Sequence, residues 1–309
     1  MKNTFLRSSV ILIKSRSEAL GLWLWCSIVS ALIVGRGFPP IVPSFLAFTS
    51  MFFIALAVYI YNDIADRVAD QYNEFKNDRP LVSGDVSVSD AKKLVYIASI
   101  VGLGVSLYNG FMSFLFSCFY FTVFMLYSYP RTHLKKRFLV KEAVISYGMI
   151  MVSLSVTYAL IGAFSSRVLV GFVLFSVFAF CAMPTGFDST DVEADRIQGV
   201  ISMASVLSIR QRMTLSMAGM LVVMAMTPFV YLFFGYNVIF PISMAVFGVS
   251  FLGLMFPLMR GINPSAYEVD RSVIMKAKKI ILSSIIVICI CVILGSLDLN
   301  ALNIKFFYN

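Results

Sequence analysis

Residues 41–70 read IVPSFLAFTSMFFIALAVYIYNDIADRVAD, an apolar stretch that ends in three carboxylates. No charge interrupts it between Ile41 and Asn62, and a helix needs roughly 20 apolar residues to cross a bilayer. Lys and Arg, rather than Asp, usually accumulate at the cytoplasmic end of such a helix. The stretch therefore predicts a transmembrane helix, and the acids at its end require a chemical explanation.

The composition of the whole chain agrees with a membrane protein. Apolar residues make up 59% of its 309 residues and charged residues 13%, whereas soluble domains contain about 25% charged residues. Several further apolar stretches are long enough to span a bilayer. The predicted helices, about nine in number, cover residues 19–35, 41–61, 91–109, 111–129, 142–163, 168–187, 213–234, 237–259 and 279–297.

The basic residues predict the orientation of these helices. If the N-terminus is cytoplasmic, every Lys and Arg except Arg36, Arg167 and Lys305 falls on the cytoplasmic side. Cytoplasmic loops carry such an excess of Lys and Arg, so we expect an integral, multi-pass protein whose N-terminus and active-site loops are cytoplasmic. The net charge of +9 then follows from topology and indicates no nucleic-acid partner. The five cysteines lie inside predicted helices, which favours apolar packing over a disulfide or zinc site.

Two sets of aspartates share the spacing Asp-x-x-Asp-x-x-x-Asp, and each set follows a predicted helix. Their members are Asp63, Asp66 and Asp70 after the second helix, and Asp188, Asp191 and Asp195 after the sixth. This spacing brings the carboxylates of a set onto one helical face, where like charges repel unless a cation lies among them. Hard oxygen ligands without His or Cys suit Mg²⁺. We predict that the two sets face each other and hold Mg²⁺ ions bridging a diphosphate.

These motifs resemble those of the UbiA superfamily of intramembrane prenyltransferases. The segments that carry the resemblance are Asn62-Asp63-x-x-Asp66-x-x-x-Asp70, Asp78-Arg79-Pro80-Leu81-x-Ser83-Gly84 and Asp188-x-x-Asp191-x-Glu193-x-Asp195-Arg196. The resemblance implies an all-α polytopic membrane protein, a bundle of about nine transmembrane helices around a central cavity with cytoplasmic cap loops. Residues 1–309 would form a single domain of two helical halves, with acid motifs at 62–70 and 188–195.

The resemblance also implies an activity. The enzyme would move an isoprenyl group from a polyprenyl diphosphate to a hydrophobic or amphipathic acceptor, either an aromatic ring or a glycerophosphate lipid, and release diphosphate. Position by position, the implied catalytic residues are Asn62, Asp66, Asp70, Asp191 and Asp195. These aspartates would also bind Mg²⁺, and Asp63 and Asp188 are either further metal ligands or supports for the ligands.

Cationic residues near the motifs are candidates for binding the diphosphate, because a diphosphate needs cationic donors beside its metal ions. The loop after the fourth predicted helix resembles the family's Tyr-Pro and Lys-Arg segment. The candidates are Arg79, Tyr127, Lys135, Lys136, Arg137 and Lys141. The positive-inside bias also accounts for the basic loop, and a pair with Asp78 would account for Arg79. Arg16, before the first predicted helix, is a weaker candidate for binding an acid group of the acceptor.

Other functions remain open from sequence alone. A terpene cyclase of the same superfamily would use the same aspartates and quench the carbocation within its own substrate. A transporter or ion-binding protein would place ionisable residues near the middle of its helices, whereas the acids here cluster at one membrane surface. The intact second motif disfavours a phosphoribosyl-transferring relative. Transfer between molecules is the commoner activity in the superfamily and is the prediction we carry forward.

Overall fold

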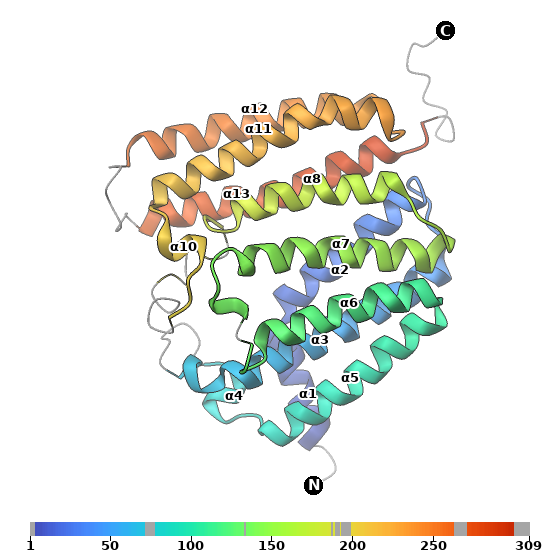
Figure 1. The fold of residues 1–309 in the computed structure, drawn as a ribbon, viewed down its shortest axis with the longest axis vertical. Coiled ribbons are helices and arrows are strands. Elements are labelled where there is room, and N and C mark those ends of the chain that lie inside the picture. Colours follow the sequence, from blue (N-terminus) through green and yellow to red (C-terminus); the bar gives the residue numbers. More distant parts are fainter. Residues whose placement is uncertain are drawn as a thin grey trace.

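The computed structural model describes residues 4–71, 78–132, 134–186, 188, 192, 199–262 and 271–299, and every regular element in these ranges is a helix. Long helices run alongside one another, while the short elements lie together at one end of the bundle, at left in Figure 1. We call this end the loop end. The short elements are α4 (Pro80–Ser83), the 3₁₀ helix η1 (Leu134–Lys136) and α10 (Met203–Val206).

Every predicted transmembrane segment coincides with a helix. The helices are α2 (Ser17–Val34), α3 (Ile41–Asp70), α5 (Val88–Tyr108), α6 (Phe111–Ser128), α7 (Val140–Ile161), α8 (Ser166–Ala182), α11 (Ile209–Phe233), α12 (Ile239–Arg260) and α13 (Arg271–Ser296). Among the described residues, eight of these are long and apolar enough to cross a membrane, and α8, with 17 residues, is a shorter apolar helix. An all-α, multi-pass membrane fold is therefore confirmed, whereas the single domain of two helical halves stays a prediction.

The helix boundaries differ from the predicted ones where local chemistry decides them. α3 continues to Asp70, past the predicted end of the membrane span at residue 61, so the first acid motif forms the last turns of this helix, as its spacing predicted. α8 ends at Ala182, before the predicted residue 187, where Pro184 lacks the backbone N–H that would extend the helical hydrogen bonds. α11 begins at Ile209, where the side chains of Ser208 and Gln211 form a capping box.

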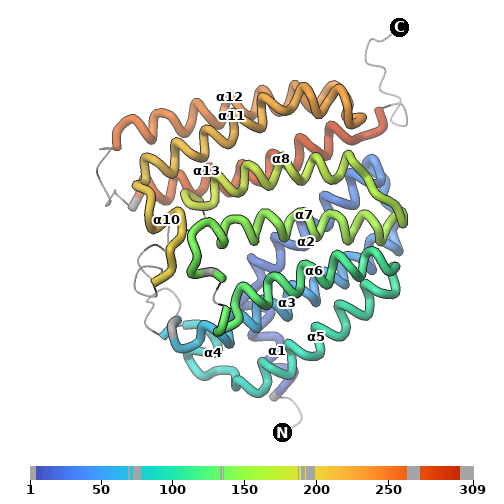
Figure 2. The backbone as a smooth tube through the Cα atoms, in the orientation of Figure 1, coloured from blue at the N-terminus to red at the C-terminus, as the bar shows by residue number. Residues whose placement is uncertain are grey.

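An additional helix, α1 (Thr4–Ser15), precedes the first predicted span. It runs crosswise to the long helices in Figure 2 and packs against α5, where the Ser8 hydroxyl donates a hydrogen bond to Asp90 Oδ2 at 3.2 Å. The chain turns at Arg16 and continues as α2. This turn holds Arg16 beside Asp63, in the last turns of α3.

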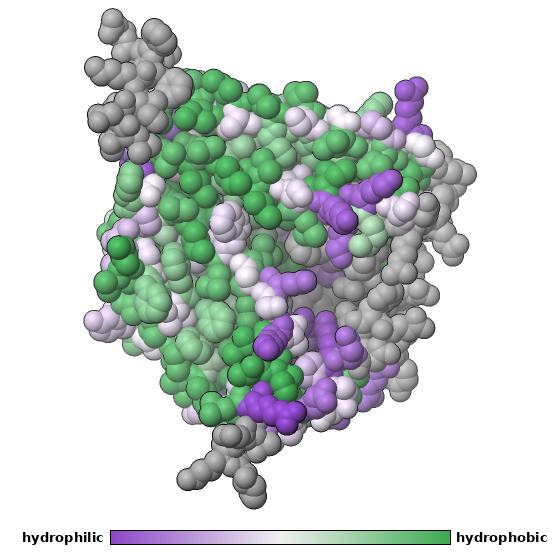
Figure 3. Space-filling model, turned by 180° about the vertical axis from the view of Figure 1, so that it is seen from behind, coloured by the Kyte–Doolittle hydropathy of each residue, from purple (hydrophilic) through white to green (hydrophobic). Residues whose placement is uncertain are grey.

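Close helix contacts and an apolar exterior complete the fold. Ser50 on α3 donates a hydrogen bond to the carbonyl of Gly102 on α5 at 2.9 Å, since the absence of a Cβ at Gly102 lets the two backbones approach. Apolar side chains such as Leu232 and Val246 point outward, as expected for a surface in contact with lipid. Figure 3 shows this largely hydrophobic surface from behind, with hydrophilic residues gathered around a hollow.

Candidate active site

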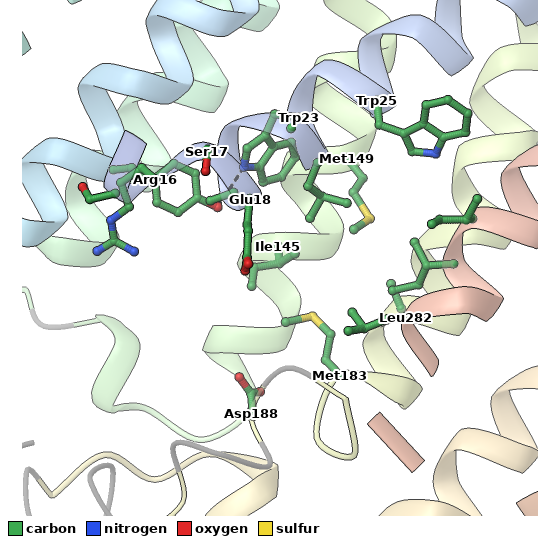
Figure 4. A pocket seen from close by; sticks show the side chains of 18 of the residues that line it. Arg16, Ser17, Glu18, Trp23, Trp25, Ile145, Met149, Met183, Asp188 and Leu282 are labelled. Carbon is green, nitrogen blue, oxygen red and sulfur yellow. Dashed lines mark hydrogen bonds between the residues drawn. The ribbon is translucent and has the colours of Figure 1, made fainter. Parts of the chain in front are cut away.

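A cavity of about 760 Å³ lies between α2, α7, α8 and α13. Most of its wall is apolar, formed by residues that include Leu22, Trp23, Trp25, Ile145, Met149, Met183, Leu282, Ile285 and Ile286. Its other lining residues include Lys14, Arg16, Glu18 and Asp188, and Figure 4 shows Arg16 on the opposite side of the view from Trp25, with Asp188 near Met183. The cavity therefore suits a ligand with one charged end and a long apolar body.

Asp63, on α3, is the centre of an ion network beside this cavity. Arg16 donates hydrogen bonds to both of its carboxylate oxygens, from Nε to Oδ2 at 2.8 Å and from Nη2 to Oδ1. Nη1 of Arg79 donates to Oδ1 of Asp63 at 3.2 Å and to Oδ2 of Asp70 at 2.5 Å. Both carboxylates are buried. Charge-assisted bonds of this kind are strong, so the network connects α3 to the α1–α2 turn and to the start of α4.

Arg16 keeps its charge in this environment. Burial, followed by the positive charge of Arg79, lowers the pKa of the Arg16 guanidinium to about 10, against the opposing effects of Tyr59, Asp70 and Asp66. At neutral pH the guanidinium remains protonated. It also lies over the ring of Tyr59, 5.7 Å from the ring centroid, which is within the range of a cation–π interaction.

The other described members of the first motif are Asn62 and Asp66. Oδ1 of Asn62 accepts a hydrogen bond from the Ser128 hydroxyl, at the end of α6, at 2.7 Å. Asp66 is partly exposed on the same helix and raises the pKa of Arg16. The structure therefore places the predicted residues of α3 at the loop end, beside the Arg16 side of the cavity.

Only the first member of the second motif, Asp188, lies among the described residues. Its Oδ1 is 2.9 Å from the Nζ of Lys141, in the first turn of α7, and its side chain is buried on the cavity wall. Asp191 and Asp195 lie outside the described residues, so their catalytic and metal-binding roles stay predictions. In the part of the chain that is described, no three His, Cys, Asp or Glu residues converge as a ready metal site.

The predicted diphosphate-binding residues fall into two groups. Arg79 and Lys141 are ion-paired with motif aspartates. Tyr127 is half-buried in the last turn of α6, and Lys136 and Arg137 are exposed at η1. Lys135 also belongs to η1, but its side chain lies outside what the structure describes. The binding of diphosphate by any of these residues stays a prediction.

Sequence reasoning missed Trp23, Tyr59 and Glu142. Nε1 of Trp23 donates a hydrogen bond to the Tyr59 hydroxyl at 2.9 Å, and both residues line the cavity. Tyr59 precedes Asp63 by one helical turn, so helical periodicity was a usable signal for it. Glu142 is fully buried and accepts a hydrogen bond from the backbone N–H of Met203 at 3.0 Å, a contact that no sequence pattern indicated.

The oxygen donors of the motif aspartates fit Mg²⁺, which prefers carboxylate and water ligands to nitrogen or sulfur. An all-helical membrane protein with an apolar cavity, one motif aspartate on the cavity wall and others beside it has the arrangement expected of an intramembrane prenyltransferase. Comparison with known families agrees with this class. The chain belongs to the UbiA prenyltransferase family, whose sequence profile matches residues 23–270.

Individual relatives have similar lengths and folds. Digeranylgeranylglyceryl phosphate synthase from Sulfurisphaera tokodaii is 29% identical over 211 residues, which are 67% of this chain and 70% of that protein. A solved structure of a digeranylgeranylglyceryl phosphate synthase matches with a TM-score of 0.73 at 22% identity, covering 96% of this chain and 99% of the other. A UbiA homologue from Archaeoglobus fulgidus bound to GPP and Mg²⁺ matches with a TM-score of 0.63 at 13% identity, covering 92% and 99%. At these identities, the two solved structures show a shared fold.

Proposed function

We propose that this prenyltransferase is Mg²⁺-dependent and moves an isoprenyl group from a polyprenyl diphosphate to a glycerophosphate lipid, releasing diphosphate. The observation that carries the proposal is the cavity, which combines apolar walls with Arg16 and Asp188. A polyprenyl diphosphate has the same division between a charged head and an apolar chain. Its head would lie by the motif aspartates and its chain along α2, α7 and α13.

The site residues have complementary parts in this proposal. Mg²⁺ would be held by Asp66 and Asp70, together with Asp191 and Asp195, and would neutralise charge on the departing diphosphate. The cations Arg79 and Lys141 would donate to the diphosphate oxygens. Support comes from the Archaeoglobus fulgidus homologue, which was solved with GPP and Mg²⁺.

The proposed acceptor class has two supports. One is the name of the Sulfurisphaera tokodaii relative, a digeranylgeranylglyceryl phosphate synthase. The other is the pair of cations Lys14 and Arg16 on the cavity lining, which suits a phosphate on the acceptor. An aromatic acid acceptor, which the sequence left open, is the competing outcome of the experiment below.

A cytoplasmic location of the site is part of the proposal. It rests on the basic residues at the loop end, such as the exposed Lys136 and Arg137, and on the positive-inside bias of membrane proteins. The N-terminus would lie on the same side. The test of this orientation uses Lys136→Cys and a membrane-impermeant thiol reagent, applied to intact and to opened cells. Labelling in intact cells would contradict the proposed orientation.

The central experiment measures diphosphate release by the detergent-solubilised full chain. Geranylgeranyl or farnesyl diphosphate is supplied with and without Mg²⁺, and with a geranylgeranylglyceryl phosphate, with 4-hydroxybenzoate or with no acceptor. Release that needs both Mg²⁺ and the glycerophosphate lipid is the expected result. Release only with 4-hydroxybenzoate would replace the acceptor class, release of a terpene without any acceptor would indicate a cyclase, and the absence of release in every arm would contradict the proposed reaction.

A further inference from the structure

Glu18 is a carboxylate on the cavity wall to which the proposed function gives no role. It belongs to the first turn of α2, and its side chain is exposed to the open cavity. The other carboxylate among the described lining residues is that of Asp188, which is paired with Lys141 at 2.9 Å. In the described part of the chain, the Glu18 carboxylate has neither an ion pair nor a hydrogen bond. Its oxygens are therefore available to a molecule in the cavity.

The place of Glu18 is where the charged part of the cavity meets the apolar part. Figure 4 shows its side chain pointing into the cavity, with Arg16 on one side and the apolar Met149 and Leu282 on the other. In the proposed function, the donor's diphosphate lies in the charged part and its isoprenyl chain in the apolar part. The bond that breaks, between C1 of the isoprenyl group and the diphosphate oxygen, then lies between the two parts, beside Glu18.

The acceptor's phosphate directs the acceptor's hydroxyl group to the same place. Lys14 and Arg16 are the lining cations proposed for this phosphate, and Glu18 follows Arg16 by two residues. The reacting hydroxyl of a glycerophosphate is only a few bonds from the phosphate. A phosphate held at Arg16 therefore brings this hydroxyl within reach of the Glu18 carboxylate, and the two cations offset the repulsion between carboxylate and phosphate.

We infer that Glu18 is the general base of the transfer step and takes the proton of the acceptor's hydroxyl group. The inference rests on the proposed function for the identities of donor and acceptor. As the bond between C1 and the diphosphate breaks, its electron pair leaves with the diphosphate. The hydroxyl oxygen forms the new bond to C1, and its proton passes to a carboxylate oxygen of Glu18. Because the side chain is exposed, it returns this proton to water before the next turnover.

Other ionisable groups surround Glu18 and have to be separated from it. Those among the described lining residues are Lys14, Arg16, Tyr59 and Asp188, whereas the lining residues of α7, α8 and α13 are apolar. The pKa of Arg16 is about 10, so this residue stays charged at acidic pH. Carboxylates share one acidic titration range, so the motif aspartates also influence the rate there. The part due to Glu18 is therefore measured as the ratio of wild-type rate to variant rate.

The experiment measures the single-turnover rate of product formation against pH. The full chain is supplied with geranylgeranyl diphosphate, Mg²⁺ and a geranylgeranylglyceryl phosphate. At neutral pH, Glu18→Gln should lower the rate by about 100-fold or more, because general bases typically contribute about 10²–10⁴-fold. The donor KM should stay within about twofold. As the pH falls and Glu18 of the wild type is protonated, the ratio of the two rates should shrink. A ratio that stays constant with pH, or a wild-type rate in Glu18→Gln, would overturn the inference.

Two further variants keep the test decisive. Glu18→Asp retains a carboxylate but withdraws it by one methylene, so it should lower the rate by about tenfold and keep the wild-type fall in rate at acidic pH. It replaces Glu18→Gln if the latter does not fold, and a wild-type rate in Glu18→Asp would contradict a positioned base. Ser17→Ala changes the neighbouring lining residue and should keep the wild-type rate at every pH.

A structural role and a failure of the proposed reaction each give a different result. A carboxylate in the first turn of a helix interacts favourably with the helix dipole. If that were the only role of Glu18, Glu18→Gln would lower the melting temperature and leave the rate ratio independent of pH, which overturns the inference. If the proposed reaction itself is wrong, the wild-type protein releases no diphosphate with any acceptor, a result that does not depend on Glu18.

Discussion

Trp23 on α2 donates a hydrogen bond from its indole Nε1 to the hydroxyl of Tyr59 on α3, at 2.9 Å. Tyr59 lies one helical turn before Asp63, and its ring forms part of the cavity wall. The guanidinium of Arg16 lies 5.7 Å from the centroid of this ring. Because the Tyr59 ring already contacts one cation, it offers a cation-binding surface on α3, one helical turn before Asp63.

The first prediction concerns this ring. Positive charge develops on the isoprenyl group as diphosphate leaves, and a cation–π interaction contributes about 0.5–2 kcal/mol. Tyr59→Leu should therefore lower kcat by roughly 2- to 30-fold, whereas Tyr59→Phe, which keeps the ring, should change kcat by less than about twofold. The measurement is product formation under saturating donor and acceptor. Equal losses in both variants would assign the effect to the hydroxyl and its bond to Trp23 instead.

The second prediction concerns Asp66, which is partly exposed and lies outside the hydrophobic core. Asp66→Asn should lower kcat by about 10²–10³-fold, because it removes a group that stabilises charge in the transition state. The melting temperature should be unchanged. Asp85→Asn, an exposed acid in the loop between α4 and α5, is the matched control and should keep full activity. Wild-type turnover in Asp66→Asn would remove Asp66 from the metal site.

The third prediction concerns metal removal. Chelation with EDTA should stop diphosphate release, and adding Mg²⁺ should restore it, because all the proposed ligands are oxygens suited to a hard divalent cation. Ca²⁺ should restore less activity, since it prefers longer bonds and more ligands than Mg²⁺. The readout is the initial rate of diphosphate release at each metal concentration. A full rate in excess EDTA would contradict the proposed use of Mg²⁺.

The sequence predicted local features well and distant partners poorly. Apolar stretches located each membrane helix, because a span needs a minimum length of apolar residues and nothing else in the chain meets that condition. The spacing of Asp63, Asp66 and Asp70 predicted a shared face because it depends only on helical periodicity. The bond from Arg16 to Asp63 joins residues that are brought together by the turn after α1 and by the packing of α2 on α3. Such a contact depends on tertiary packing, which a single sequence does not reveal.

The fourth prediction concerns Glu142, whose partner was also hidden from the sequence. Its Oε1 accepts the N–H of Met203 at the start of α10, and the residue is fully buried. Glu142→Ala should lower the free energy of unfolding by about 1–3 kcal/mol, because it leaves a buried N–H without its acceptor. Glu142→Gln keeps an acceptor oxygen and should cost less. The two variants are compared by thermal unfolding in detergent, and an equal loss in both would indicate that the charge matters rather than the hydrogen bond.

The fifth prediction uses two glycines of α5 that face different surroundings. A Cβ added at Gly102 would lie 2.6 Å from Ile54 Cγ1, 2.9 Å from the Ile54 backbone N and 3.1 Å from the Ser50 carbonyl O. Backbone atoms cannot rotate away, so Gly102→Ala should force α3 and α5 apart and cost about 1–3 kcal/mol of unfolding free energy. Gly104 has no such neighbour within 4 Å, and Gly104→Ala should be neutral or stabilising by up to about 1 kcal/mol through helix propensity. Thermal unfolding in detergent compares the two variants, and similar melting temperatures would show that α3 and α5 do not approach closely at Gly102.

The same pair of variants should differ in activity. Because α3 carries the first acid motif, Gly102→Ala should also reduce activity, while Gly104→Ala should not.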